Sequence, residues 1–453
     1  MDGTGRSVLD LQHGVPGAAT AQVRELPSGR RVVWLEVDGS HHRGDLSAAA
    51  SQVIASAAST ALTKGLPLVG QFASSGADIR EGIPALHGWG TAAKALADCS
   101  GAVPVLCIVN GPAVSGPALL IGLADFVVMT EDAYAFVSGP TMVEEFTGIA
   151  VSTDELGGAA ANARHSGAAH AVVADMVAAT AWVDELLAFL PDNVNDLATR
   201  ADTADPDDRS TPDAGDLLPD SPTGSYDVRH VIEAIVDDGY HFETRARWAT
   251  NVVTTFATVA GYPVGIVANQ PMALAGTLDI PASQKAARFV AFCDAFNLPI
   301  LTLVDTPGFY PGKDLEWRGM IRHGAQLVFA YGRATVPRIC VILRKSYGGA
   351  YIVMDSKKMG NDLCLAWPGA ELAVMGAGQA SAILQRRATA DEKAEFERDY
   401  AERLLNPYVA AERGFVDAVV EPSDTRREIC AALHMLRDKR ERLVSRKHDN
   451  SPL

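Results

Sequence analysis

The sequence predicts an α/β fold, because short apolar segments alternate with helical stretches along most of the chain. One pattern occurs twice: an apolar strand, a small polar turn, a helix, a second apolar strand and a glycine turn. Ser74 and Gly116 mark the two turns of the first copy, and Thr306 and Gly349 mark those of the second. In each copy the turns are about 42 residues apart, the length of one βαβ unit. We therefore expect two related α/β halves.

The expected elements of the first half follow from local patterns. Alanine-rich and periodic stretches predict helices at 47–62 and 83–98, and a further helix opens after the glycine turn, at 118–123. Short runs of apolar and β-branched residues predict strands at 31–37, 66–72, 103–109, 125–129 and 133–138.

The second half repeats this alternation more clearly. A hairpin is expected around Ala260-Gly261-Tyr262, between strands at 252–259 and 263–269. Further strands are predicted at 300–304 and 336–343, and helices at 281–296, 315–332 and from 349 to 354. Charged amphipathic stretches at 391–400 and 426–444 predict two more helices, the last with a basic end that is solvated or lies at an interface.

Composition narrows the class of protein. The chain has 453 residues, 48% of them hydrophobic, and a formal net charge of −16, which argues against nucleic acid as the main partner. No run of about 18 uncharged apolar residues predicts a membrane span. The six cysteines are scattered without a CxxC pair, so neither a metal site nor disulfides are expected. Because no secretory signal pattern is present, the cytoplasm is the expected compartment.

An acidic segment separates the two halves. Residues 201–225 hold seven aspartates and four prolines, with Arg209 as the single basic residue. This composition predicts a solvated linker, and an acidic docking segment is the alternative. The expected domains are therefore 1–200 and 226–453, joined by an acidic linker at 201–225.

Four ordered motifs in the second half resemble those of one enzyme family. They are DTPGFYPG at 305–312, RHGA at 322–325, RKSYGGAY at 344–351 and AWPGAE at 366–371. Weaker matches are SGP at 138–140, ELGGA at 155–159 and YDVR at 226–229. Together they resemble the carboxyltransferase (β) subunit of biotin-dependent acyl-CoA carboxylases, such as propionyl-CoA and acetyl-CoA carboxylases. The resemblance implies two tandem crotonase-like domains of the spiral ββα type. It also implies a ring-shaped hexamer whose active sites join the N-terminal half of one subunit to the C-terminal half of another.

The resemblance further implies that a carboxyl group moves from carboxybiotin to the α-carbon of an acyl-CoA. Charge then develops on the ureido oxygen of biotin and on the thioester oxygen of an enolate. Pairs of backbone N–H groups at a helix start stabilise such charge. By the resemblance, Gly349 and Ala350 hold the ureido oxygen, and Ser115 and Gly116 hold the thioester oxygen. The alternative for any such glycine turn is tight packing or a positive φ.

Seven residues near these turns are candidates for substrate binding: Gly76, Ala77, Thr306, Gly308, Tyr347, Tyr351 and Ile352. The two tyrosines would line a biotin channel, with core packing as the alternative. Asp305 and Thr306 would otherwise cap the turn that follows them. His323 is expected to be a hydrogen-bonded packing residue in mid-helix rather than a base.

Three features depart from the family. Its members usually carry dozens more residues before the strand at 31–37, including helices that help to bind the CoA adenine. In the first half, Pro117 follows the glycine turn and has no N–H, and Asp78 stands where the family has an arginine. Ile352 replaces an aspartate of the propionyl-type members, which predicts a preference for acetyl or longer apolar acyl groups.

The expected partners follow from what the sequence lacks. It contains neither the Met-Lys-Met context of a biotinylated lysine nor an ATP-grasp-like glycine loop. A biotin carboxylase and a biotin carboxyl carrier chain are therefore expected, together with assembly as a homo-hexamer or hetero-oligomer. Two alternatives keep the fold: a biotin-independent acyl-CoA decarboxylase, and a non-catalytic scaffold subunit of a carboxylase complex.

Overall fold

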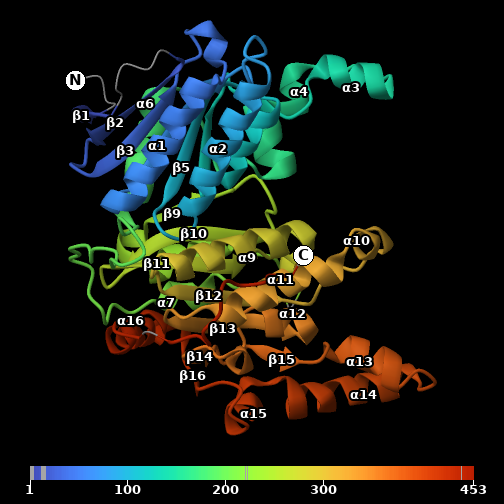
Figure 1. The fold of residues 1–453 in the computed structure, drawn as a ribbon. Coiled ribbons are helices and arrows are strands. Elements are labelled where there is room, and N and C mark those ends of the chain that lie inside the picture. The colour runs from blue at the N-terminus through green and yellow to red at the C-terminus, as the bar shows by residue number, and fades with distance from the viewer. Residues whose placement is uncertain (1–4, 12–16, 220, 222, 440, 453) are drawn as a thin grey trace. The chain divides into compact units, whose positions relative to one another are not determined.

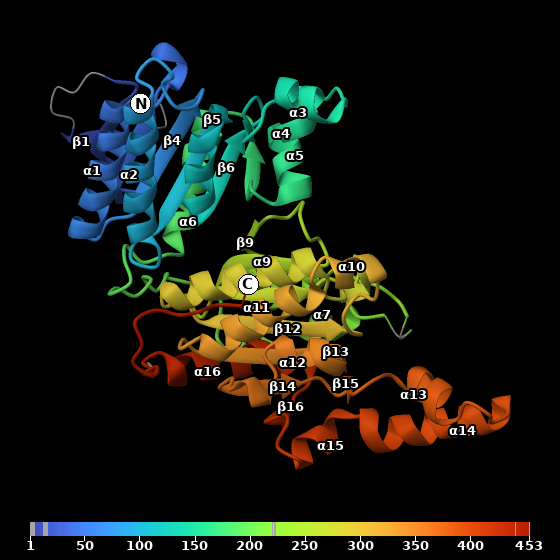
Figure 2. The same ribbon diagram turned by 45° about the vertical axis from the view of Figure 1, so that its right-hand side comes forward.

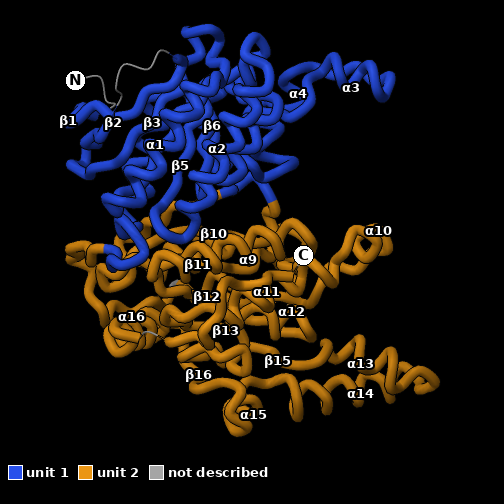
Figure 3. Tube along the Cα trace, in the orientation of Figure 1, with its two compact units in different colours: residues 1–198, 245–248 blue, residues 199–244, 249–453 orange. Residues whose placement is uncertain are grey.

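The computed structural model describes residues 5–11, 17–219, 221, 223–439 and 441–452. The chain forms two compact units (Figure 3). Unit 1 comprises residues 1–198 and 245–248, and unit 2 comprises residues 199–244 and 249–453. Over the described ranges, none of the helices combines the length and the apolar character needed to cross a membrane.

Unit 1 is built on one sheet with the strand order β1-β2-β3-β4-β5-β6-β8 and with β7 paired to β5 (Figure 1). The pairs β1/β2 and β2/β3 are antiparallel, and every pairing from β3 onward is parallel. The strands are β1 (Arg6–Asp10), β2 (Ala19–Glu25), β3 (Arg31–Val37), β4 (Leu68–Ser74), β5 (Val105–Val114), β6 (Phe126–Thr130), β7 (Tyr134–Phe136) and β8 (Ala171–Val173).

Unit 2 repeats this topology strand for strand. Its order is β9-β10-β11-β12-β13-β14-β16, with β15 paired to β13, and again only the first two pairings are antiparallel. The sequence repeat is thus a repeat of sheet topology. The strands are β9 (His241–Thr244), β10 (Val252–Val259), β11 (Tyr262–Asn269), β12 (Ile300–Thr306), β13 (Arg338–Tyr347), β14 (Leu363–Ala366), β15 (Glu371–Ala373) and β16 (Ala418–Val419).

Two helices lie side by side on one face of the unit 1 sheet: α1 (Ala48–Lys64) and α2 (Ile83–Cys99) (Figures 1 and 2). Alternate residues of β3, such as Val33 and Leu35, point to this face and share one apolar core with both helices. Ser47 begins α1, because its side chain accepts a hydrogen bond from the Ala50 amide at 3.0 Å. The other helices of the unit include η1 (His42–Gly44), η2 (Gly116–Leu123), α3 (Pro140–Thr147), α4 (Thr153–Gly157), α5 (Ala159–Ala161), η3 (Asn162–Ser166) and α6 (Met176–Ala188).

Helices cover both faces of the unit 2 sheet. On one face, α9 (Ile280–Ala295) lies beside α11 (Met320–Arg333), and Phe256 of β10 packs on Phe289 and Phe292 of α9. On the other face, neighbouring β10 residues such as Val253 and Ala257 share a core with α8 (Val228–Ile235) and α16 (Thr425–Leu436). The remaining helices include α7 (Pro212–Asp216), α10 (Lys313–Trp317), α12 (Gly348–Val353), α13 (Ala377–Leu384), α14 (Ala390–Tyr400), η7 (Ala401–Leu405) and α15 (Pro407–Glu412).

The predicted strands and most helices are confirmed, and three helices differ. The helix expected at 315–332 is divided into α10 and α11, because Gly319 adopts φ 93° between them. The helix expected to open at 118–123 is a 3₁₀ helix that begins at Gly116. The final helix ends at Leu436 rather than 444, and beyond it Lys439 binds Asp362 at 2.8 Å.

The acidic segment at 201–225 belongs to unit 2, and it is partly packed there, although Asp202, Asp207, Asp208 and Asp216 are exposed as expected. Thr211 donates its hydroxyl to the Pro422 carbonyl at 2.6 Å, and Ala214 of α7 is fully buried. Asp205 pairs with Arg209 at 2.6 Å and lies 3.5 Å from the fully buried Arg426. These arginines neutralise the negative charge of Asp205, which the composition of the segment had suggested would be exposed to solvent.

Candidate active site

The strand registers show that the two glycine turns occupy equivalent positions. Strand β5 pairs with β7 up to Val114, and strand β13 pairs with β15 up to Tyr347. The next residue is Ser115 in unit 1 and Gly348 in unit 2. Both have a positive φ, 66° for Ser115 and 62° for Gly348, so the backbone turns in the same sense in both units.

In unit 2, the turn presents the amides of Gly349 and Ala350. Both residues lie in the first turn of α12, where N–H groups have no acceptor within the helix. The partial positive charge of a helix start adds to their attraction for an oxyanion. Gly349 faces the Phe309 ring, since a side chain at 349 would meet that ring at 3.4 Å. Ala350 is fully buried, so the turn is held rigidly by packing.

In unit 1, the equivalent turn presents fewer amides. By register, Gly116 and Pro117 correspond to Gly349 and Ala350, and proline has no N–H. The Ser115 amide, which we expected to donate to substrate, donates instead to the Phe136 carbonyl at 3.1 Å. For the Gly116 amide, no acceptor is found among the residues that the structure describes. Gly116 is also sterically fixed, because a side chain there would meet the Trp89 ring at 3.2 Å.

The two polar turns that precede the helices are equivalent as well. Gly76 has φ 112° and Gly308 has φ 144°, which favours glycine at both positions. Ala77 forms an isolated parallel bridge with Leu46, as Phe309 does with Leu278. The Ser74 hydroxyl accepts a hydrogen bond from the Gly76 amide at 3.2 Å.

Thr306 is placed to stabilise its turn. Its side chain is fully buried, and its hydroxyl lies 3.3 Å from the Gly308 carbonyl and 3.4 Å from the Gly308 amide. These contacts favour the capping alternative over direct contact with a substrate.

Behind this turn, Asp305 is the centre of a buried polar cluster. Its carboxylate accepts hydrogen bonds from the Tyr226 hydroxyl at 2.9 Å, from Arg344 Nε at 3.1 Å and from the Lys345 amide at 3.1 Å. Burial raises the pKa of Asp305, and the Arg344 guanidinium opposes that rise. We missed this cluster in the sequence, although Tyr226 and Arg344 belong to the motifs at 226–229 and 344–351.

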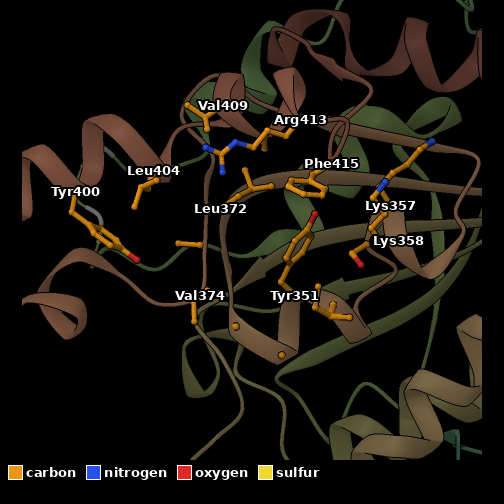
Figure 4. Close-up of a pocket in the computed structure, with 16 residues that line it drawn as sticks. Tyr351, Lys357, Lys358, Leu372, Val374, Tyr400, Leu404, Val409, Arg413 and Phe415 are labelled. Atoms are coloured by element: carbon orange, nitrogen blue, oxygen red, sulfur yellow. The ribbon is translucent and has the colours of Figure 1, made fainter. Parts of the chain in front are cut away.

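A cavity of about 550 Å³ opens beside α12 (Figure 4). Tyr351 and Ile352 line it, and Ile352 keeps 43% of its surface exposed. Tyr347 does not line this cavity, because its hydroxyl is bound to Glu371. Burial raises the pKa of both tyrosines, so both stay protonated at neutral pH.

The far wall of this cavity comes from a segment that carries no motif. It contributes Tyr400, Leu404, Val409, Ala410, Arg413 and Phe415. Two further cations, Lys357 and Lys358, line the cavity just after α12. The expected site residues therefore form two sets. Gly76, Ala77, Ser115 and Gly116 lie in unit 1, and the others lie in unit 2.

His323 lies in the first turn of α11 rather than in mid-helix, because the helix restarts after Gly319. Its Nδ1 lies 3.2 Å from Gln284 Nε2 and 3.3 Å from Gln326 Oε1. These side-chain amides hold the imidazole, in keeping with a hydrogen-bonded packing residue.

Comparisons with known proteins agree with this geometry. The carboxyl transferase domain family matches residues 26–451. The chain is 45% identical to the propionyl-CoA carboxylase β chain of Saccharopolyspora erythraea, over 94% of this chain and 81% of that protein. It is 41% identical to the methylmalonyl-CoA decarboxylase subunit α of Veillonella parvula, over 97% of this chain and 86% of that protein.

Among solved structures, the chain resembles the transcarboxylase 12S hexamer with methylmalonyl-CoA bound. The TM-score is 0.94 at 42% identity, over 96% of this chain and 85% of that chain. This similarity covers both units and confirms the predicted pair of crotonase-like domains. With a family match along nearly its whole length, the chain belongs to the carboxyl transferase domain family and is an acyl-CoA carboxyltransferase subunit.

Proposed function

We propose that the protein transfers a carboxyl group between carboxybiotin and the α-carbon of an acyl-CoA, with one oxyanion site in each unit. The observation that carries this proposal is the amide pair of Gly349 and Ala350 in the first turn of α12, with Gly349 lining the cavity of unit 2. One such donor is worth about 3–4 kcal/mol of transition-state stabilisation when it is aimed at a developing oxyanion.

In unit 2, the turn binds the ureido oxygen of biotin. The adjoining cavity fits that group, because Gly349 and apolar side chains such as Leu372 and Phe415 line it, while the cations Lys357, Lys358 and Arg413 suit a developing negative charge. Carboxybiotin supplies the carboxyl group and, once that group has left, a site that accepts a proton. The residues of this chain orient the ring system and exclude water, and no side-chain base is required.

In unit 1, the turn at Ser115 and Gly116 binds the thioester oxygen of the acyl-CoA. Loss of an α-proton places negative charge on that oxygen, and the Gly116 amide stabilises it. Gly76 and Ala77 form the opposite turn of this site. Asp78 brings a negative charge to that turn, and Arg80 binds it at 2.9 Å, which lowers the pKa of Asp78.

The acyl group is acetyl or a longer apolar chain. Ile352 supports this proposal, because it follows the glycine turn and presents an apolar side chain to the cavity. An aspartate at the same position would place a charge against the acyl group, which disfavours apolar acyl chains there.

The protein acts with a biotin carboxylase and a biotin carboxyl carrier chain in the cytoplasm, and assembles as a hexamer or hetero-oligomer. Helix α3 supports an oligomer, since none of its residues is buried and Met142 and Phe146 are exposed. The related transcarboxylase 12S subunit is a hexamer.

A biotin-independent acyl-CoA decarboxylase is the second candidate. A relative supports it, because the Veillonella parvula protein that is 41% identical to this chain is named a methylmalonyl-CoA decarboxylase subunit. The test is to supply malonyl-CoA and methylmalonyl-CoA, with and without free biotin, and to follow loss of the carboxyl group. Loss that requires biotin supports carboxyl transfer, and loss without biotin supports the decarboxylase. No loss in either case supports a scaffold role.

A further inference from the structure

Ser115 has a backbone conformation that is almost restricted to glycine. Its φ of 66° and ψ of −158° lie in a region where a Cβ is strongly disfavoured. At the equivalent position, unit 2 has Gly348 with φ 62°. A serine in this conformation lowers the stability of the folded protein relative to a glycine. The fold by itself therefore favours glycine at position 115, and the serine side chain calls for another explanation.

The turn that carries this serine is short of hydrogen-bond donors. The Ser115 amide is bound to the Phe136 carbonyl at 3.1 Å, and Pro117 has no amide. Of the three backbone positions, only Gly116 offers an N–H to a ligand. The equivalent turn of unit 2 offers two, so one donor is missing from unit 1.

The Ser115 hydroxyl is free to supply that donor. The residue is exposed, and over the described part of the chain no hydrogen bond involves its Oγ. Gly76 keeps the space in front of it open, because a Cβ at 76 would lie 3.2 Å from Ser115 Cβ and 3.8 Å from its Oγ. Ser115 directly precedes Gly116, so its hydroxyl and the Gly116 amide belong to the same turn.

We propose that the Ser115 hydroxyl donates a hydrogen bond to the thioester oxygen of the acyl-CoA and replaces the amide that Pro117 lacks. This inference rests on the proposed function of unit 1. The hydroxyl keeps its proton throughout: it stabilises the oxyanion of the enolate, while the α-proton leaves to the biotin side. Ser115 is then a catalytic residue through its side chain.

Four variants and one control test the proposal. Ser115→Ala removes the hydroxyl but keeps a Cβ in the unfavourable backbone conformation. Ser115→Gly removes both the hydroxyl and the Cβ, and it is expected to fold at least as well as the wild type. Pro117→Ala restores an amide, and it is also combined with Ser115→Ala. The control is Ser100→Ala, an exposed serine at the end of α2.

Two readouts are compared in the full-length protein. The first is kcat for biotin-dependent loss of the carboxyl group from malonyl-CoA. Ser115→Ala and Ser115→Gly should each lower it on the order of 10²-fold, with a smaller change in KM. Pro117→Ala should recover part of the loss in Ser115→Ala, and the Ser100 control should match the wild type. The second is the infrared carbonyl frequency of bound acetyl-CoA with ¹³C at the thioester carbon. Hydrogen bonding lowers this frequency, so both Ser115 variants should show a smaller shift than the wild type.

The carbonyl shift separates this inference from the proposed function. If the wild type shows the shift and Ser115→Ala reduces it, the hydroxyl is a donor, even if no variant transfers carboxyl groups and the proposed function fails. If Ser115→Ala retains the full shift, or the wild type has none, the inference is overturned, whatever happens to kcat. Normal transfer by Ser115→Ala with an unchanged shift would overturn it and leave the proposed function intact.

Discussion

Replacing Gly349 with proline removes one proposed oxyanion donor and adds a ring beside Phe309. Proline is tolerated in the first turn of a helix, where its missing N–H breaks no helical hydrogen bond. Gly349 lies in that turn of α12, so the helix should survive. Loss of a single oxyanion donor lowers kcat by about 10²–10³, equivalent to about 2.7–4 kcal/mol. We expect Gly349→Pro to lower biotin-dependent transfer by that factor.

Gly349→Ala is the matched control. It adds a Cβ that would lie 3.4 Å from the Phe309 ring, an ordinary contact, and it keeps the amide. We expect its kcat to stay within a few fold of the wild type. Both variants should bind acyl-CoA normally, because the proposed thioester site belongs to unit 1.

The assay follows loss of the carboxyl group from malonyl-CoA with free biotin, with acyl-CoA affinity measured separately by calorimetry. Transfer by Gly349→Pro within threefold of the wild type would refute a donor role for this amide. Equal losses in the proline and alanine variants would show instead that the turn is sensitive to added volume.

Three further predictions concern unit 2. Ile352→Asp should change the ranking of acetyl-, propionyl- and longer acyl-CoA substrates by kcat/KM, and an unchanged ranking would remove Ile352 from acyl selection. Thr306→Val should lower the free energy of unfolding by about 1 kcal/mol through loss of the turn hydrogen bonds, and leave KM for acyl-CoA unchanged. A raised KM without a change in stability would instead place Thr306 in substrate binding. Arg344→Met should cost about 3–5 kcal/mol in urea unfolding, because it leaves the Asp305 carboxylate buried without its cation. Adding Asp305→Asn should recover part of this loss, and a cost below about 1 kcal/mol would contradict the buried-pair argument.

Much of the fold could be predicted because its signals are local. Periodic alanine-rich stretches and short apolar runs placed α1, α2 and the β10–β11 hairpin close to their observed bounds. The helix from 315 to 332 was predicted as continuous because Gly319 carries little information by itself. The positive φ of Gly319 accompanies the break between α10 and α11, which only the structure shows.

The candidate site was predicted unevenly. The motifs located the turns at Ser115 and Gly349, since short glycine turns leave a contiguous trace in the sequence. They did not show that the Ser115 amide is bound to the Phe136 carbonyl, because that bond depends on the pairing of β5 with β7. The far wall of the cavity was missed for a similar reason. Its residues between 400 and 415 reach the glycine turn only through tertiary folding.

By itself, the sequence determined the repeated α/β plan, the order of the turns and the family. Each of these properties depends on short runs of contiguous residues, about as long as a strand or a turn. The tertiary structure decided which backbone amides of the glycine turns are already hydrogen-bonded, which charged side chains are paired, and which residues line the cavity beside α12. The acidic segment illustrates the difference: its composition indicates solvent, but Arg209 and Arg426 hold Asp205 against unit 2. Hydrogen bonding and burial depend on residues that are distant in the chain, and a local pattern does not specify them.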